Sequence, residues 1–173
     1  MDIETQRLIL RRFKDSDLND FFEYTSESDV MEISGIKEAK TLGEAKELLD
    51  EWKHKGMSLA IELKESGKVI GHISIKEDSE AGLDDVKELG FGLNCNFHRK
   101  GYMSEAVKGV LGYLFNNGVN KVYACCYQNN APSKGLIEKS GFEFEQVGIY
   151  ISKTLHTEKN TYEYFMAKDK FEA

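Results

Sequence analysis

Proline is almost absent from this chain, with Pro132 the single example among 173 residues. Cysteine is also scarce, and because Cys95, Cys125 and Cys126 show no metal-ligand spacing, we expect reduced thiols in an intracellular protein. No apolar run is long enough to cross a bilayer, and residues 1–4 show neither the basic nor the apolar part of a secretion signal. We therefore expect a cytoplasmic protein with no membrane partner.

Positive charge is in deficit, since 23 lysines and arginines face 30 aspartates and glutamates. The net charge of −7 argues against nucleic acid as the main partner and favours cationic acceptors such as amines. Several catalytic patterns are missing as well: Gly-x-Ser-x-Gly, Walker A, Gly-x-Gly-x-x-Gly and His-Glu-x-x-His. The four histidines are scattered along the chain, so we expect no metal cofactor.

The residues that are present indicate one globular domain over residues 1–173, because 40% are hydrophobic and 31% are charged. The apolar periodicity predicts helices that begin after Asp15, Thr41, Gly101 and Asn130. Connections are predicted over 24–40 and 76–86, and a turn over 156–161. Strands are predicted over 8–13, 58–63, 68–75, 88–94, 121–127, 142–150 and 162–168.

The chain is organised around residues 88–106, where a strand leads through a basic loop into an amphipathic helix. The first turn of that helix directs unpaired N–H groups and a positive dipole end into the loop, which contains Gly101. Such a terminus, flanked by Arg99 and Lys100, suits an anion such as a phosphate. Many strand-to-helix turns carry glycine and a basic residue without any ligand, so spacing alone leaves both interpretations open.

Three segments together resemble one family. Residues 99–106, preceded by 88–91, resemble the acetyl-CoA signature of the GNAT N-acetyltransferases, although only Gly101 strictly matches the core pattern Gln/Arg-x-x-Gly-x-Gly/Ala. Residues 129–142 resemble the second GNAT signature, Asn-x-x-(Ser/Ala)-x-x-Leu-x-x-x-x-Gly-Phe. Residues 4–11 resemble the Thr-x-Arg-Leu-x-Leu-Arg start of the RimJ/RimL branch, which acetylates ribosomal-protein N-termini.

This resemblance implies an α/β GNAT fold with a central mixed, mostly antiparallel sheet flanked by helices and splayed where the strands of Glu88 and Lys121 part. It implies transfer of acetyl from acetyl-CoA, as co-substrate, to a primary amine by direct attack. A protein N-terminus is the leading acceptor, and a polyamine or aminoglycoside is the alternative. A non-catalytic acyl-CoA-binding module also stays open, and a homodimer is one assembly that the sequence allows.

The resemblance also implies which residues bind the cofactor. Backbone N–H groups near 91–93 would hold the thioester carbonyl oxygen, the basic loop would hold the diphosphate, and an asparagine would contact the pantetheine amides. The predicted cofactor-binding residues are Phe91, Gly92, Leu93, His98, Arg99, Lys100, Gly101, Tyr102, Met103, Ser104, Asn129 and Asn130. Capping of a helix would explain either asparagine equally well.

Two residues are predicted to be catalytic. Glu88 shares a strand face with Gly90 and Gly92, where a ligand or another backbone approaches closely, and it is either the amine's base or an ordinary solvent-facing glutamate. Ser133 matches the serine that hydrogen-bonds the sulfur in the RimJ/RimL branch, or it is a simple hydroxyl at a helix start. Ile137 stands where other GNAT enzymes place a tyrosine acid. His72 and Trp52 are interpreted as structural residues.

Overall fold

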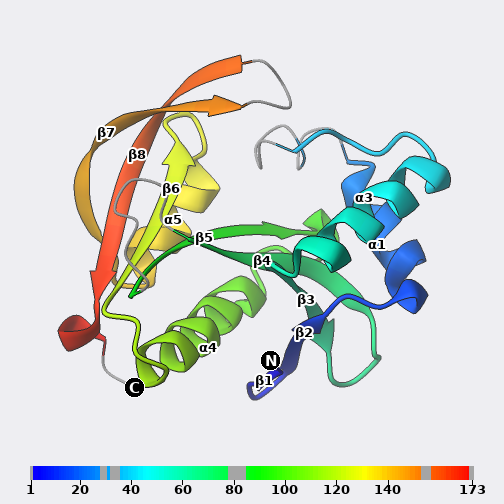
Figure 1. Ribbon diagram of the computed structural model, residues 1–173, viewed down its shortest axis with the longest axis horizontal. Helices are drawn as coiled ribbons and strands as arrows, with labels where there is room; N and C mark the ends of the chain where they lie inside the picture. The colour runs from blue at the N-terminus through cyan, green and yellow to red at the C-terminus, as the bar shows by residue number, and fades with distance from the viewer. Residues whose placement is uncertain (1, 28–30, 32–35, 78–84, 153–156, 172–173) are drawn as a thin grey trace.

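One mixed sheet of eight strands organises the computed structural model, which describes residues 2–27, 31, 36–77, 85–152 and 157–171 (Figure 1). The strands follow the order β1-β2-β3-β4-β5-β6-β8-β7, and every neighbouring pair is antiparallel except β5 with β6. The strands are β1 (Ile3–Glu4), β2 (Leu8–Arg12), β3 (Ser58–Leu63), β4 (Val69–Glu77), β5 (Val86–Leu93), β6 (Lys121–Tyr127), β7 (Glu143–Ser152) and β8 (Thr157–Ala167). The described α-helices are α1 (Leu18–Thr25), α3 (Leu42–Lys55), α4 (Tyr102–Asn116) and α5 (Ala131–Lys139), with 3-10 turns η1 (Asp15–Asp17), η2 (Cys95–Phe97) and η3 (Lys168–Lys170).

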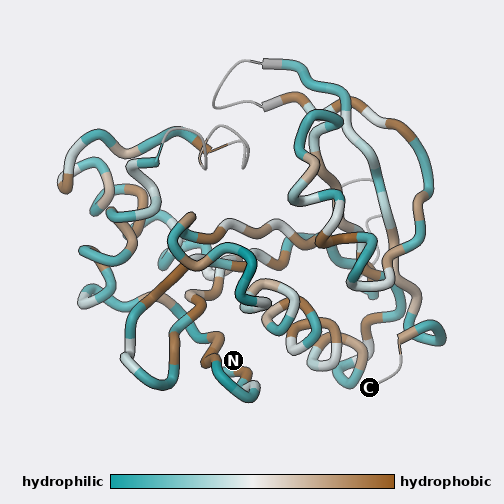
Figure 2. Tube along the Cα trace, turned by 180° about the vertical axis from the view of Figure 1, so that it is seen from behind, coloured by the Kyte–Doolittle hydropathy of each residue, from teal (hydrophilic) through white to brown (hydrophobic). Residues whose placement is uncertain are grey.

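Helices cover both faces of the sheet. The apolar residues of α4 recur every three or four positions, and Val107, Val110 and Leu111 are buried against the strands on one face. On the other face α1 and α3 pack on β3 and β4 through Phe21 and Leu49. Figure 2 shows the hydrophobic colour gathered on the strands that pass α4 and the hydrophilic colour on the surface turns. No helix within the described ranges is long and apolar enough to cross a membrane.

The sheet splits between β5 and β6. The two strands pair only over Val86–Leu89 and Lys121–Ala124. Beyond that point β5 stays paired with β4 as far as Leu93, while β6 stays paired with β8 as far as Tyr127. Figure 1 shows β6, β8 and β7 rising away from β5. This confirms the predicted fold, including the place where the strands part.

Cap geometry explains the predicted helix starts after Thr41 and Asn130. The side chain of Thr41 accepts a hydrogen bond from the Glu44 backbone at the start of α3, which ends at left-handed Gly56. Glu44 in turn accepts from the backbone of Lys40, one residue before the N-cap, so the capping box is displaced by one position. Pro132 lies in the first turn of α5, where its missing N–H does no harm.

The predicted turn over 156–161 is wrong in its described part, because β8 begins at Thr157. The polar residues there pair with β7, for example Asn160 with Ile149, and this tertiary pairing overrides a sequence that lacks strand alternation. The short β1 was not predicted, since two residues carry no periodicity. Within the predicted connection over 24–40, the structure describes 24–27, 31 and 36–40, and α1 ends at Thr25 as expected. The predicted connection over 76–86 is too long at both ends, because β4 continues to Glu77 and β5 begins at Val86, while 78–84 lie outside the described residues.

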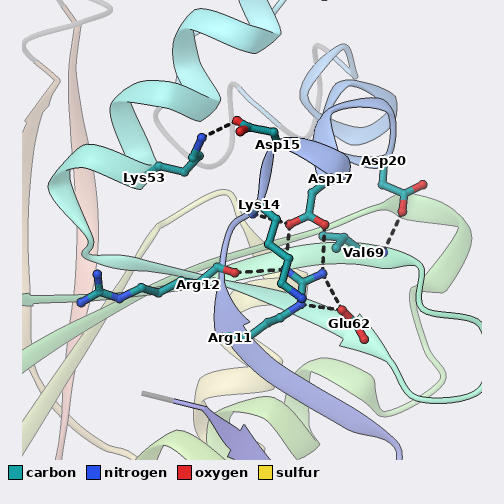
Figure 3. Close-up of polar contacts among 9 residues, drawn as sticks. All are labelled: Arg11, Arg12, Lys14, Asp15, Asp17, Asp20, Lys53, Glu62 and Val69. Carbon is teal, nitrogen blue, oxygen red and sulfur yellow. Dashed lines mark hydrogen bonds and ion pairs between the residues drawn. The ribbon is translucent and has the colours of Figure 1, made fainter.

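Arg11 anchors the entry to α1 (Figure 3). Its guanidinium donates to both carboxylate oxygens of Asp17 in η1, at 2.7 and 2.9 Å, and its Nε donates to Glu62 of β3 at 2.5 Å. A third carboxylate, that of Asp20, accepts from the Val69 backbone at 2.9 Å. These contacts fix α1 to the face of the sheet opposite α4.

Candidate active site

A cavity of about 80 Å³ lies where β5 and β6 part. The wall includes Glu88 and Phe91 from β5, together with Asn130 and Ser133 from the start of α5. These four residues were predicted from two separate sequence segments, and the splayed sheet brings them to one cavity. The remaining lining comes from Lys76, Leu89, Gly90, Cys125, Cys126, Tyr127, Tyr150 and Thr161.

Glu88 borders the cavity and stays partly exposed to solvent. Its side chain is 30% exposed, and its Oε1 lies 3.6 Å from Nζ of Lys76, which is its direct cross-strand neighbour on β4. The carboxylate therefore borders the cavity with a cation beside it. A carboxylate in this position can take a proton from a group bound in the cavity.

Ser133 and Asn130 divide two tasks at the start of α5. The Asn130 side-chain oxygen caps the helix by accepting from the Ser133 backbone at 3.1 Å, so the capping interpretation of Asn130 is confirmed. The Ser133 hydroxyl makes no hydrogen bond with any described residue, and it is free to donate into the cavity. Asn129, its predicted alternative, is exposed.

The glycine face of β5 has a cause that the sequence did not reveal. A Cβ added at Gly92 would lie 2.6 Å from Cε1 of His72, and one at Gly90 would lie 2.6 Å from Oγ of Ser74. Real Cβ atoms do not approach other atoms so closely. The close neighbours are therefore side chains of β4, directly across the strand pair, and neither is backbone.

His72 is a buried residue that faces a hydroxyl, in agreement with its interpretation as structural. It is 3% exposed, lies 3.5 Å from the Tyr24 hydroxyl through Nδ1, and packs edge-on against Trp52. Burial, followed by the charge of Lys76, lowers the pKa of His72 to about 3. The imidazole is therefore neutral at physiological pH, and it does not line the cavity.

Cys125 adds a neutral thiol to the cavity wall. Burial raises its pKa to about 12, with the charge of Glu88 as the next contribution. A thiol in this state is a poor nucleophile at neutral pH. Among the described residues, no group of histidine, cysteine, aspartate and glutamate is arranged to hold a metal ion.

The loop after β5 presents backbone donors. Asn94 caps η2, Arg99 has φ 59° and Gly101 has φ 81°, so the chain makes two left-handed steps before α4. The first intrahelical bond runs from the Glu105 N–H to the Gly101 carbonyl, and no side chain caps α4. The N–H groups of Tyr102, Met103 and Ser104 are therefore left for an anion, which fits the diphosphate of a CoA molecule.

Several side chains of this loop make contacts within the protein. His98 Nε2 donates to the Leu93 carbonyl at 2.9 Å, and Lys100 lies over the ring of Phe97 at 5.2 Å. Met103, in the first turn of α4, is buried in the core. The His98 side chain thus holds the Leu93 carbonyl and the Met103 side chain packs in the core, while the binding of a CoA diphosphate by this loop stays a prediction.

The roles of Thr5 and Arg7 at the loop were not predicted from the sequence. Thr5 and Arg7, just before β2, both bond the carboxylate of Glu105 in the first turn of α4. Their segment was noted as a resemblance, but no spacing in one dimension links residues that are 98 positions apart. The place of Lys76 was not predicted either, because it becomes a neighbour of Glu88 only through the pairing of β4 with β5.

Comparison with known proteins identifies the architecture. The family model described as an acetyltransferase (GNAT) domain matches residues 7–143. An uncharacterized N-acetyltransferase, YnaD of Bacillus subtilis, is 33% identical over 150 residues, which cover 84% of each chain. A GNAT-family acetyltransferase from Bacillus anthracis superposes with a TM-score of 0.85 at 26% identity, over 98% of this chain and 99% of that one.

A more distant structure shares the fold. Spermidine N-acetyltransferase from Vibrio cholerae, solved with CoA and spermine, has a TM-score of 0.76 at 17% identity, over 96% of this chain and 98% of that one. The family model covers far more than half of the 173 residues, and the relatives that match over most of their length are named acetyltransferases. The chain accordingly belongs to the GNAT family and is an acetyltransferase.

Proposed function

We propose that this acetyltransferase transfers acetyl from acetyl-CoA to the N-terminal amine of a protein. The observation that carries the proposal is the cavity at the β5–β6 split, which has Glu88 and Ser133 on its wall. The loop that follows β5 leads to the start of α4, where no side chain caps the helix and the unpaired backbone N–H groups suit a diphosphate. β5 and the loop after it thus connect the cavity to the proposed diphosphate site.

Acetyl transfer makes three demands on the protein. The amine must lose a proton, the thioester carbonyl must be polarised, and the departing sulfur must be stabilised. Glu88 accepts the proton directly or through water, N–H groups of 91–93 on the unpaired edge of β5 hold the carbonyl oxygen, and the Ser133 hydroxyl donates to the sulfur. The C–N bond forms as the C–S bond breaks, and CoA leaves.

The choice of acceptor rests on sequence. The opening segment, residues 4–11, resembles the RimJ/RimL branch, whose members acetylate protein N-termini. A small amine is the second candidate, and the spermidine acetyltransferase that shares this fold is an example of a protein acting on such an acceptor. A third candidate, a non-catalytic acyl-CoA-binding module, keeps the loop and loses turnover.

The test is a thiol-release assay with acetyl-CoA. The pure protein is offered a panel of ribosomal-protein N-terminal peptides, the same peptides with a blocked N-terminus, polyamines and aminoglycosides. We expect release with free N-termini and none with the blocked peptides, which are the matched controls. Release confined to the small amines overturns the proposed acceptor, and CoA binding without release for every acceptor supports the binding module.

A homodimer and a cytoplasmic location stay predictions. The edge strand β7 offers the surface for a second copy, because Phe144, Val147, Ile149 and Ile151 lie on one of its faces and are 54–66% exposed. An unprotected apolar edge without proline or lysine favours strand pairing. Sedimentation velocity over a hundredfold range of concentration distinguishes a dimer from a monomer.

A further inference from the structure

The segment before β2 is hydrogen-bonded to the start of α4. One carboxylate oxygen of Glu105 accepts from the Thr5 hydroxyl at 2.6 Å and from the Arg7 backbone at 2.7 Å. The other oxygen accepts from Arg7 Nε at 2.7 Å. The guanidinium also covers the ring of Tyr102 at 4.4 Å. Every side-chain acceptor of Glu105 is thus engaged by a segment 98 or more residues away.

Arg7 also sets the orientation of a peptide in the anion loop. Its Nη1 donates to the Lys100 carbonyl at 3.0 Å, and its Nη2 lies 3.4 Å from the position of an added Cβ on Gly101. In a trans peptide the carbonyl and the following N–H point in opposite directions. Holding the Lys100 carbonyl toward Arg7 therefore turns the Gly101 N–H away from Arg7, to the opposite side of the loop.

The ion pair also removes a charge conflict. A glutamate in the first helical turn stabilises the helix dipole, but its charge repels a phosphate bound at the same terminus. Burial acts to raise the pKa of Glu105, and the hydrogen bonds from Thr5 and Arg7 outweigh it, so the pKa is lowered and the group is ionised at neutral pH. Arg7 neutralises this carboxylate at 2.7 Å and so leaves the loop without net repulsion.

We propose that Arg7, supported by Thr5 and Glu105, is a positioning residue for the CoA diphosphate. It fixes the Lys100–Gly101 peptide and cancels the charge of Glu105, so that the amides of 101–104 present an unopposed anion site. The inference rests on the proposed function only in that the loop takes CoA. It does not depend on the acceptor or on the identity of the base.

The experiment compares two ligands by calorimetry, CoA, which carries the diphosphate, and pantetheine, which lacks it. For Arg7→Met we expect affinity for CoA to fall about tenfold, since a hydrogen-bonded ion pair with one partly exposed partner is lost. Affinity for pantetheine should stay within about twofold. The control is Lys46→Met, because Lys46 forms an exposed ion pair with Asp50 within α3, on the face of the sheet opposite α4.

The double variant Arg7→Met/Glu105→Gln isolates the charge effect. If the stranded carboxylate repels the diphosphate, the double variant recovers part of the CoA affinity that Arg7→Met loses. A loss of CoA and pantetheine affinity in equal proportion overturns the proposal, because it reports general damage to the cleft. An unchanged CoA affinity in Arg7→Met overturns it too. Failure of the wild-type protein to bind CoA would instead defeat the proposed function.

Discussion

Arg11 offers the sharpest test of how the fold is held (Figure 3). The change is Arg11→Met, which keeps the aliphatic length of the side chain and removes the guanidinium. Two carboxylates then remain without their shared partner, those of Asp17 and Glu62, whose side chains are 5% and 18% exposed. Among the described residues, Asp17 then keeps only the backbone donor of Lys14, at 2.8 Å.

The expected loss follows from the burial of these groups. Removing one partner of a buried ion pair typically costs about 3–5 kcal/mol, and the partial exposure of Glu62 places this case at about 3–4 kcal/mol. For a chain of this length each kcal/mol shifts the melting temperature by about 3 °C. We therefore expect Arg11→Met to melt about 9–12 °C below the wild-type protein.

The assay is thermal unfolding followed by circular dichroism, with Arg12→Met as the control. Arg12 is the next residue of β2, its side chain is exposed, and only its carbonyl contacts Arg11, at 3.0 Å. The control should melt within about 2 °C of the wild type. A drop of similar size in both variants would refute the reasoning, since the cost would then belong to β2 and not to the buried pair.

The pH dependence of the stability difference between Arg11→Met and the wild type supplies a second test. The hydrogen bond to Asp17 raises the pKa of Arg11, against the effect of burial, which lowers it. The stability that the charged guanidinium gives the wild-type protein is therefore present at neutral and mildly alkaline pH, and it is lost only as the pH rises through the raised pKa. In Arg11→Met the stranded carboxylates favour protonation in the folded state. The gap between variant and wild type should therefore narrow as the pH falls from about 7 to about 4.5, and a widening gap contradicts the argument.

Three further predictions concern β5 and the cavity beside it. Glu88→Gln should lower kcat by about 100-fold or more without weakening CoA binding in calorimetry, and an unchanged kcat removes Glu88 from the mechanism. Gly92→Ala should destabilise the protein by about 1–3 kcal/mol in urea unfolding, because the new Cβ meets His72 at 2.6 Å, and Gly92→Ala/His72→Ala should recover part of that loss. Cys125, with a pKa of about 12, is roughly 10⁻⁴ thiolate at pH 8, so iodoacetamide should label exposed Cys95 first; peptide mass spectrometry that finds Cys125 labelled first contradicts this assignment.

Local signals in the sequence predicted the features that local chemistry decides. Thr41 and Gly56 mark the ends of α3 because a hydroxyl cap and a left-handed glycine act within one turn. The apolar stripe of α4 predicted its buried face for the same reason. The β5–β6 split was predicted from the family resemblance, since nothing in the two strand sequences states where parallel pairing stops.

Features that depend on cross-strand or long-range contacts could not be predicted in this way. Gly90 and Gly92 indicated a close neighbour, but only the β4–β5 register shows that Ser74 and His72 are the groups involved. The partner of Glu88 is set by the same register. The identity of the acceptor amine is even harder to predict from the sequence, because its recognition depends on side chains that several elements bring together around the cavity.

The opening segment of the chain makes side-chain contacts on both faces of the sheet. Thr5 and Arg7 hold Glu105 at the start of α4, while Arg11 holds Asp17 before α1. β2, which is paired with β3 along its whole length, connects these two sets of contacts, which lie on opposite faces of the sheet. A shift of β2 would therefore move the anion loop and the helix over the other face together. The Thr-x-Arg-Leu-x-Leu-Arg pattern is thus explained by the mutual placement of two helices, without any of its residues lining the cavity itself.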